Sequence, residues 1–349
     1  MKFVCYTDWT QLPESANVLF EKGARENMFF SRPWFENLVA TTLENDQSML
    51  LACVAEEYNV LAILPLIQHS DGNWESLSHS YSSLYSLLLA EDDQSESAQS
   101  KILACLARGL SQLSFLSLSL KPFDENDVKV LGLQQAMEAL GMSCHRGFRF
   151  FNWSYAVQGQ TFEQYMAKRP GKVRSTIARK QRKLEREQGC EIRLFIDQEI
   201  QQAMADYNAA YMASWKAHEQ SGVLMDGLVK HFAKQGWLRL AVLYIQNQPA
   251  AAQLWFVVHD KASIFRLAYD EAWKQYSPGS ILTKFLMEYV INTDKVDEID
   301  FLTGNERYKQ DWMSQRKGRF ELVCANKLKS SNKSYLVIDR LKGLLKTLS

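Results

Sequence analysis

The chain has 349 residues, of which 46% are hydrophobic and 23% are charged. This composition is that of a globular protein and excludes a disordered or fibrous chain, while the length allows two domains. Basic and acidic residues number 40 each, so the net charge of zero predicts no global attraction to nucleic acid or to a membrane.

The cysteines and the N-terminus together predict a cytoplasmic protein. The six cysteines are scattered, and none forms a C-x-x-C pair. This is unlike a zinc site or a disulfide framework, and it predicts free thiols in a reducing compartment. They are Cys5, Cys53, Cys105, Cys144, Cys190 and Cys324. The segment Met1–Asp8 becomes polar too early for a signal peptide, and no apolar run approaches the roughly 20 residues of a membrane span.

The first half of the chain mixes helical and strand-like patterns, which favours an α/β or α+β fold over a bundle or a sandwich. Helices are expected at Trp9–Arg25, Ser31–Ala40 (with Ser31 as N-cap), Ala98–Leu110 and Val128–Leu140. Strands are expected at Ser48–Glu56 and Val60–Gln68, which form a hairpin, and at Trp74–Leu89, Phe115–Leu120 and Phe148–Val157. This half holds no phosphate-binding glycine loop, so we expect residues 1–158 to be a scaffold or substrate-shaping domain.

A basic segment, Phe162–Gln188, connects the halves and lies within residues 159–190. It combines many lysines and arginines with a thin apolar stripe of Val173, Ile177 and Leu184. A solvated connecting helix is the simpler interpretation, and a helix that faces phosphate, a polyanionic sugar or RNA is the functional one. Interleaved aromatics are missing, which argues against sequence-specific binding of single-stranded nucleic acid.

Helices at Ile200–Ser214 and Leu224–Gln235 precede the stretch where we expect the chemistry, Leu238–Met313. Strand-like runs come first, then the turn Ser277-Pro278-Gly279-Ser280, which begins an apolar helix, and then a buried strand. The strand-like runs are Leu238–Ile245, Pro249–Val258, Ser263–Tyr269 and Glu298–Leu302, and Phe320–Asn326 is expected as a last strand. The two halves have loosely similar element orders, which hints at a duplicated domain.

The turn at Ser277–Ser280 is typical of a helix start that binds an anion. Proline suits the first helical position, Ser277 can cap, and the N–H groups of Gly279, Ser280 and Ile281 are expected to point out of the helix end toward a phosphate. The same pattern also starts many helices that bind nothing.

Several polar residues nearby could carry chemistry, each with a plain structural alternative. Asp270 or Glu271 could be a general base if burial raises the pKa of its carboxyl group, or could simply lie at a solvated strand end. Tyr276 and Tyr308 could protonate a leaving thiolate, or pack by their rings. Lys309 and Arg307 could bind anions or be surface charges. The pocket-lining candidates Trp215, Lys216 and Glu219 could instead form a core tryptophan beside an exposed salt bridge.

Other chemistries lack their motifs. The histidines show no ligand spacing, so no metal is expected. There is no G-x-S-x-G elbow, P-loop or G-x-G-x-x-G. The tail Ser334–Leu348, within residues 329–349, has one apolar helical face. It is expected to pack on the body, with peripheral membrane contact as the alternative.

An ordered series of blocks resembles the GNAT-superfamily acyltransferases of the BioF2-like or cellulose-biosynthesis (CelD-like) type, relatives of the Fem-type aminoacyl transferases. The blocks are Ser214–Lys216, Gly236–Leu240, Pro249–Trp255, Leu267–Glu271, Tyr276–Ser280, Glu298–Gly304 and Tyr308–Met313. The resemblance covers about Phe162 to Asn326.

The resemblance implies tandem GNAT-like domains, each a mixed twisted sheet flanked by helices. The first, residues 1–158, would be degenerate, and the second, residues 191–328, would be the acyltransferase. Acetyl-CoA or another acyl-CoA would be the donor substrate, without a metal. Its pantetheine would lie beside Ser263–Tyr269 and its phosphates at Ser277–Leu282. The implied donor-binding residues are Arg266, Leu267, Ala268, Tyr269, Tyr276, Ser277, Gly279, Ser280, Ile281 and Leu282.

The resemblance also suggests site residues for acceptor and catalysis. Asp270, Glu271 and Tyr308 are the expected catalytic residues. The expected acceptor-binding residues are Trp215, Lys216, Glu219, Trp255, Asp300, Lys309, Arg174 and Arg179. The usual loop, Q/R-x-x-G-x-G/A, is reduced here to Tyr276–Ser280.

Three functions follow. The first is an N-acyltransferase that acts on a small amine or amino sugar in polysaccharide or cell-envelope synthesis. The second is Fem-type transfer from aminoacyl-tRNA, in which the basic helix binds RNA. The third is a non-catalytic partner in a polysaccharide-synthesis complex. No DNA partner is expected, and neither the acceptor nor the oligomeric state is predicted.

Overall fold

The computed structural model describes residues 1–90, 96–215 and 222–325. The chain divides into two compact units. Unit 1 comprises Met1–Phe150 and Gly318–Ser349, and unit 2 comprises Phe151–Lys317. The predicted C-terminal helix and the candidates Lys216 and Glu219 lie outside the described residues.

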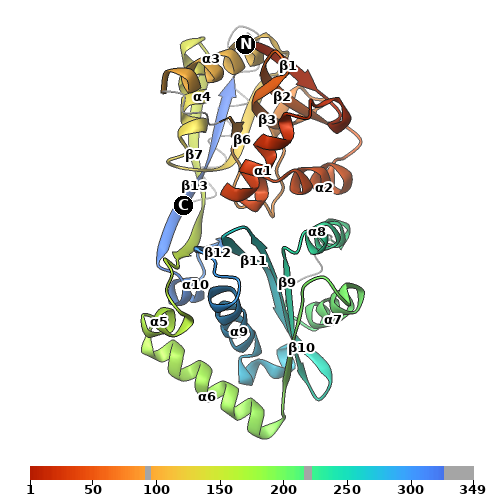
Figure 1. Ribbon diagram of the computed structural model, residues 1–349, viewed down its shortest axis with the longest axis vertical. Coiled ribbons are helices and arrows are strands. Elements are labelled where there is room, and N and C mark those ends of the chain that lie inside the picture. The colour runs from red at the N-terminus through yellow and green to blue at the C-terminus, as the bar shows by residue number, and fades with distance from the viewer. Residues whose placement is uncertain (91–95, 216–221, 326–349) are drawn as a thin grey trace. The chain divides into compact units, whose positions relative to one another are not determined.

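Unit 1 is a mixed sheet with helices (Figure 1). Its sheet has the order β1-β2-β3-β4-β6-β13-β7, with β5 paired to β3. Its strands are β1 (Lys2–Tyr6), β2 (Gln47–Glu56), β3 (Asn59–His69), β4 (Asn73–Ser76), β5 (Leu88–Leu89), β6 (Ser117–Asp124), most of β13 (Gln315–Ala325) and the first part of β7 (Ser143–Ala156). Its helices are η1 (Trp9–Gln11), α1 (Ala16–Glu26), η2 (Met28–Phe30), α2 (Arg32–Thr42), α3 (Glu96–Gln112) and α4 (Val128–Ala139).

Local sequence signals predict some elements of unit 1 correctly and one of them wrongly. The β2–β3 hairpin is confirmed, and Ser31 caps α2 by accepting the Trp34 N–H at 3.3 Å. The prediction of strand throughout Trp74–Leu89 is wrong: β4 and β5 occupy only its two ends. The serine-rich segment between them instead bonds to a neighbouring strand, as when Ser78 Oγ donates to the Lys121 carbonyl of β6 at 2.8 Å.

The prediction that all six cysteines are free is wrong for two of them. Cys144 on β7 and Cys324 on β13 form a disulfide across 180 residues of sequence. Their spacing gives no sign of this, because only the pairing of distant strands brings the two Cβ atoms together. Cys5, Cys53, Cys105 and Cys190 are free thiols.

Unit 2 has a sheet of order β7-β12-β11-β10-β9-β8. Its strands are the second part of β7, β8 (Glu191–Phe195), β9 (Leu238–Ile245), β10 (Gln248–Val258), β11 (Lys261–Tyr269) and β12 (Glu298–Thr303). Its helices are α5 (Phe162–Ala167), α6 (Gly171–Glu187), α7 (Ile200–Met212), α8 (Gly222–Lys234), η3 (Glu271–Tyr276), α9 (Pro278–Asn292) and α10 (Arg307–Trp312).

Helices cover both faces of the unit 2 sheet, with α9, α5 and α6 on one side and α7 and α8 on the other (Figure 1). The α9 face is apolar because alternate strand residues point to it. One core cluster joins Tyr155 of β7, Trp255 of β10, Ile299 and Phe301 of β12, and Leu286 of α9. The residues between them, including Asp300, face the α7 side.

The basic segment is two helices, because Pro170 precedes α6 and separates it from α5. Ile177 and Leu184 are buried, so the predicted apolar stripe is the face that packs on unit 2, and most cations lie in solvent. The expected second domain, residues 191–328, differs from the observed unit 2, Phe151–Lys317, since the segment 319–325 pairs with β6 in unit 1.

The two halves repeat one topology, as their element orders hinted. In each, antiparallel strands lead to a short parallel pair that flanks a helix: β4 with β6 around α3, and β11 with β12 around α9. Each half also receives its last antiparallel partner from the other: β13 pairs with β6, and β7 pairs with β12.

Candidate active site

The central feature of unit 2 is the divergence of its two parallel strands. β11 and β12 pair only at their first residues, from Lys261 opposite Glu298 to Ser263 opposite Asp300. β11 continues to Tyr269, and among the described residues none of 264–269 pairs with β12. The β12-facing edge of β11 therefore offers backbone N–H and C=O groups to an extended ligand, which can add to a sheet edge as a strand does.

A β-bulge decides which face each β11 side chain occupies. Leu254 pairs with Arg266 and Trp255 with Ile264, so Phe265 is an extra residue. Beyond it, Leu267 and Tyr269 point to the α9 side. Arg266 lies on the α7 side, where it donates to the Tyr211 hydroxyl at 2.8 Å.

This bulge corrects part of the donor-binding prediction. Arg266 was expected to bind the donor, but its side chain bonds to Tyr211 on the α7 side of the sheet. Ala268 is fully buried against β10, so only its backbone can take part. Donor binding by Leu267 and Tyr269 stays a prediction.

The end of β11 brings three predicted residues together. The Trp215 and Tyr269 rings lie 4.6 Å apart between centroids. A Cβ on Gly279 would lie 3.3 Å from Tyr269 Cδ1, so glycine lets α9 approach this strand closely. The result is an aromatic wall beside the start of a helix, and the Trp215 side chain is 52% exposed.

Trp255 does not contact substrate as predicted, because it is fully buried. Its indole N–H donates to Gln253 Oε1 at 2.9 Å. The Gln253 amide in turn donates to the Gly279 carbonyl at 2.8 Å and to Thr283 Oγ1 at 2.7 Å. Trp255 and Gln253 therefore hold the first turn of α9 against the sheet.

The start of α9 differs from the prediction. Ser277 adopts the left-handed conformation, with φ 56° and ψ 50°, and its side chain caps nothing. The N–H groups of Ser280 and Ile281 both donate to the Ser277 carbonyl, at 3.1 and 3.2 Å. Pro278 has no N–H, so Gly279 supplies the remaining donor of this turn within the described structure. The side chains of Ile281 and Leu282 are core residues.

Two lysines of α6 lie beside this turn. Lys180 of α6 donates to the Gln275 carbonyl, directly before this turn. Lys183 lies 5.2 Å from the centre of the Tyr276 ring. The Tyr276 hydroxyl donates to Glu187 at 3.1 Å, so it faces α6 and does not serve as the predicted acid. Arg174 and Arg179 are exposed on α6.

The carboxylates after β11 lack the burial on which the general-base prediction depended. Asp270 is partly exposed, and its Oδ1 accepts the Ala272 N–H at 2.9 Å, which caps η3. Glu271 is exposed and lies 3.3 Å from Lys274 Nζ. Both are at the predicted place, at the end of β11.

The end of β12 carries the second group of predicted residues. Asp300 is only 3% exposed, and its Oδ1 accepts the Leu302 N–H at 2.7 Å and the Asn152 side-chain N–H at 2.9 Å. Leu302 has φ 53°, so this carboxylate stabilises the kink that turns β12 away from β11.

Lys309 is a buried cation, not a surface charge. Its Nζ donates to the Phe301 carbonyl at 2.9 Å and to the Thr303 carbonyl, and it lies 3.4 Å from Glu306. Burial lowers the pKa of Lys309 below its ordinary value, while Glu306 opposes the shift. Lys309 thus fixes the last residues of β12.

Tyr308 precedes Lys309 in the first turn of α10, and its side chain is 43% exposed. The surrounding protein desolvates its hydroxyl and raises the pKa of Tyr308, and the Glu306 carboxylate raises it further. The hydroxyl therefore carries its proton at neutral pH, as a general acid must.

Sequence reasoning missed Asn152 and Gln253. Asn152 is a polar residue inside the closing strand predicted at Phe148–Val157, and Gln253 interrupts an otherwise apolar strand. A polar side chain within a buried strand is a signal, but its partner is invisible until the fold places it.

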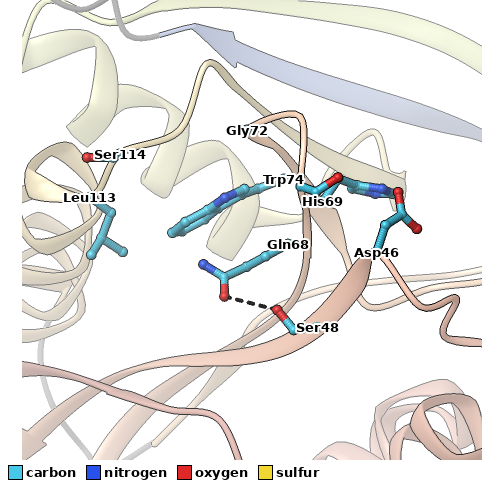
Figure 2. A pocket seen from close by; sticks show the side chains of 9 residues that line it. Asp46, Ser48, Gln68, His69, Gly72, Trp74, Leu113 and Ser114 are labelled. Atoms are coloured by element: carbon cyan, nitrogen blue, oxygen red, sulfur yellow. Dashed lines mark hydrogen bonds between the residues drawn. The ribbon is translucent and has the colours of Figure 1, made fainter.

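A hollow in unit 1 is separate from these residues. Figure 2 shows Trp74 and Gln68 inside it, with His69 and Asp46 on one side and Leu113 on the other. Its volume is about 480 Å³. None of the predicted site residues lines it, so it has no part in the site of unit 2.

Within the described ranges, no group of three or more His, Cys, Asp or Glu side chains could hold a metal ion. No described helix is long and apolar enough to cross a bilayer.

Comparison with known proteins gives the class of this fold. Residues 171–310 match the family model described as acetyltransferase (GNAT) domain. The search of curated proteins found no match. Residues 171–310 are thus similar to a GNAT acetyltransferase domain, and the reaction class they support is acyl transfer.

Solved structures extend this likeness to the whole chain. A FemX structure has a TM-score of 0.61 at 9% identity and covers 92% of this chain and 97% of its own. A tandem GNAT protein from the clavulanic acid biosynthesis pathway has a TM-score of 0.52 at 10% identity, with 92% and 97% coverage.

A third similar structure is the C-terminal domain of a putative lysylphosphatidylglycerol synthetase from Agrobacterium fabrum, with a TM-score of 0.54 at 11% identity and coverages of 94% and 96%. The fold is therefore a tandem GNAT-like fold, as the sequence implied. The BioF2-like and CelD-like assignment within it stays a prediction.

Proposed function

We propose that the protein transfers an acyl group from acyl-CoA to the amine of a small molecule or amino sugar, of the kind used in polysaccharide or cell-envelope synthesis. The observation that carries this proposal is the parting of β11 and β12. The pantetheine arm would pair with the free edge of β11 at Leu267–Tyr269, with Trp215 beside it.

The phosphates of the donor would lie at the start of α9. The Gly279 N–H and the helix dipole attract an anion there. Because the other N–H groups of this turn are used internally, cations must supply more of the attraction than in a glycine-rich loop. Lys180 and Lys183 of α6 are close enough to this turn to do so.

The reaction would use groups at the end of β11 and Tyr308, which follows β12. The amine nitrogen attacks the thioester carbon, and backbone N–H groups of the β11 edge hold the oxyanion. The carbon–sulfur bond then breaks. After the attack the nitrogen is positively charged, and it releases a proton to solvent by way of the partly exposed Asp270 or the exposed Glu271 at the end of β11. Tyr308 gives its proton to the thiolate and is reprotonated from solvent, so the net proton transfer is from nitrogen to sulfur.

Titration calorimetry of the full chain with acetyl-CoA and longer acyl-CoAs tests this donor. We expect binding by at least one of them, and a variant with both Lys180→Ala and Lys183→Ala should bind it about tenfold more weakly, since two cations are lost. Lys101→Ala, an exposed change in unit 1, is the control. Absence of heat with every acyl-CoA would overturn the proposal.

Trp215→Leu should weaken donor binding about tenfold, because a stacked aromatic surface beside Tyr269 contributes on the order of 1 kcal/mol. Its free energy of unfolding should change by less than about 0.5 kcal/mol, since half of the ring is exposed. Donor titration and urea unfolding measure the two effects. Met212→Ala, at an exposed site that ends α7, should change neither. Unaltered donor affinity in Trp215→Leu would remove Trp215 from the donor site.

A second donor, aminoacyl-tRNA, is supported by a specific observation. Helix α6 carries exposed cations, including Arg174 and Arg179, and its Lys180 contacts the residue before a turn with few backbone donors. The FemX fold is similar over 92% of this chain. This version predicts tRNA binding that weakens steeply with salt. A gel-shift titration at low and moderate salt separates the donors, and no shift at low salt would exclude it.

A further inference from the structure

Unit 2 has one polar sheet face and one apolar face. The α9 face carries the core cluster, whereas the α7 face of β7, β11 and β12 carries five buried polar residues. They are Asn152, Ser154, Ser263, Arg266 and Asp300. Burying polar groups costs free energy unless each finds a partner, so this face requires an explanation beyond stability.

Asn152, on this face, has a side-chain polar atom that its described neighbours leave without a hydrogen bond. It is 1% exposed, and its Nδ2 donates to Asp300 Oδ1 at 2.9 Å. Its Oδ1 is buried, and no hydrogen-bond partner for it is present among the described residues. The side chain thus presents an unused acceptor inside the protein.

The orientation of this amide is fixed by chemistry. Asp300 Oδ1 also accepts the backbone N–H of Leu302 at 2.7 Å, so this oxygen acts as an acceptor. The amide must turn its N–H₂ group toward it, and a flipped amide would set two acceptors against each other. The unpaired atom of Asn152 is therefore the oxygen, and the group that satisfies it must be a donor.

The strand register places this oxygen at the site. Asp300 stands opposite Ser154, and Asn152 stands opposite Thr303, beyond the last residue at which β12 pairs with β11. Trp153 and Tyr155 belong to the α9-side core, so Asn152 and Asp300 face the other side. They lie where the strands have parted, on the side opposite the predicted donor phosphates.

We propose that Asn152 Oδ1 and the Asp300 carboxylate bind the primary ammonium group of the acceptor, which releases one proton to solvent and becomes the free amine before its nitrogen attacks the thioester. An ammonium offers three donors and a positive charge, which matches one neutral and one acidic oxygen. A hydroxyl offers one donor and no charge, so this pair selects amines over alcohols. The inference rests on the proposed function and names the residues that bind the amine of its acceptor.

The first test follows the Asn152 side-chain amide by NMR in the wild-type full chain, labelled with ¹⁵N-asparagine. The Asn152→Ser variant serves only to assign this resonance, which is missing from its spectrum. The probes are glucosamine, ethanolamine and lysine, with N-acetylglucosamine and ethylene glycol as matched non-amines. We expect at least one amine to shift this resonance and neither non-amine to do so. No shift with any amine, or equal shifts with the non-amines, would overturn the proposal.

A kinetic test uses the shifting amine with the donor bound. Asn152→Ser should raise the acceptor KM about 10- to 100-fold, because a buried charged donor loses its partner, and should leave the donor Kd unchanged. The matched control is Ser154→Ala, on the same strand and face, with its Oγ 3.4 Å from Gln315. An unchanged acceptor KM would overturn this site while donor binding persists. Loss of donor binding by the wild type is instead the result that overturns the proposed function.

Discussion

Tyr308→Phe is expected to lower kcat about 100-fold, because it removes the proton donor for the leaving thiolate. The ring and its 6.3 Å contact with Phe301 remain, so the donor Kd and the free energy of unfolding should stay within error of the wild type. Steady-state assays of thiol release, donor titration and urea unfolding measure these three quantities.

The control for this prediction is Tyr58→Phe, which removes the hydroxyl of an 88% exposed tyrosine in unit 1 and should leave kcat unchanged. A Tyr308→Phe enzyme with the wild-type kcat would show that solvent protonates the thiolate. Because the pKa of Tyr308 is raised, the decline of wild-type kcat that reports its ionisation should lie above pH 10, the ordinary tyrosine value being about 10.

Lys309→Met is expected to reduce both stability and activity. Methionine fills a similar volume, but the carbonyls of Phe301 and Thr303 lose their donor. The Phe301 carbonyl is buried and the Thr303 carbonyl is partly buried, so leaving them without this donor costs about 1–3 kcal/mol in the free energy of unfolding. The end of β12 would also shift against β11, and a misplacement of about 1 Å lowers the transfer rate on the order of 100-fold.

Urea unfolding and thiol-release assays of the purified variant measure these losses. The control is Lys274→Met, which removes an exposed lysine that pairs with Glu271 and should change the free energy of unfolding by less than about 1 kcal/mol. Equal stability of the two variants would contradict the role of Lys309 at the end of β12.

The pH dependence of this difference has a definite sign. Burial lowers the pKa of Lys309 in the folded protein, so the unfolded chain binds more protons between the folded pKa and the ordinary value of about 10.4. Stability relative to Lys309→Met should therefore rise with pH through that window. Unfolding curves at several alkaline pH values check this, and a difference that falls with pH would contradict the shift.

The sequence by itself determined the elements whose signals are local. The β2–β3 hairpin, the Ser31 cap of α2 and the proline that begins α9 follow from residue patterns within about ten positions, and each is observed. The ordered blocks from Ser214 to Met313 resemble the GNAT superfamily, and it was this resemblance that implied the GNAT-like fold.

Tertiary structure decided which side chains could act. Trp255 and Tyr276 have polar groups that could act in a site, but each is buried and already hydrogen-bonded within the protein. The Trp255 indole N–H donates to Gln253, and the Tyr276 hydroxyl donates to Glu187. The extra residue Phe265 in β11 places the Arg266 side chain on the α7 face of the sheet instead of the α9 face. No local pattern records a bulge's effect on side-chain direction.

The pairing of distant strands also belongs to the tertiary structure alone. Cys144 meets Cys324, and Asn152 meets Asp300, because β7 and β13 each pair with a strand of the other half of the chain. Hydrogen bonds and disulfides form between atoms that are near in space, and separations of 148 and 180 residues carry no local signal. The sequence therefore located the site along the chain, and the fold selected the atoms that can do its chemistry.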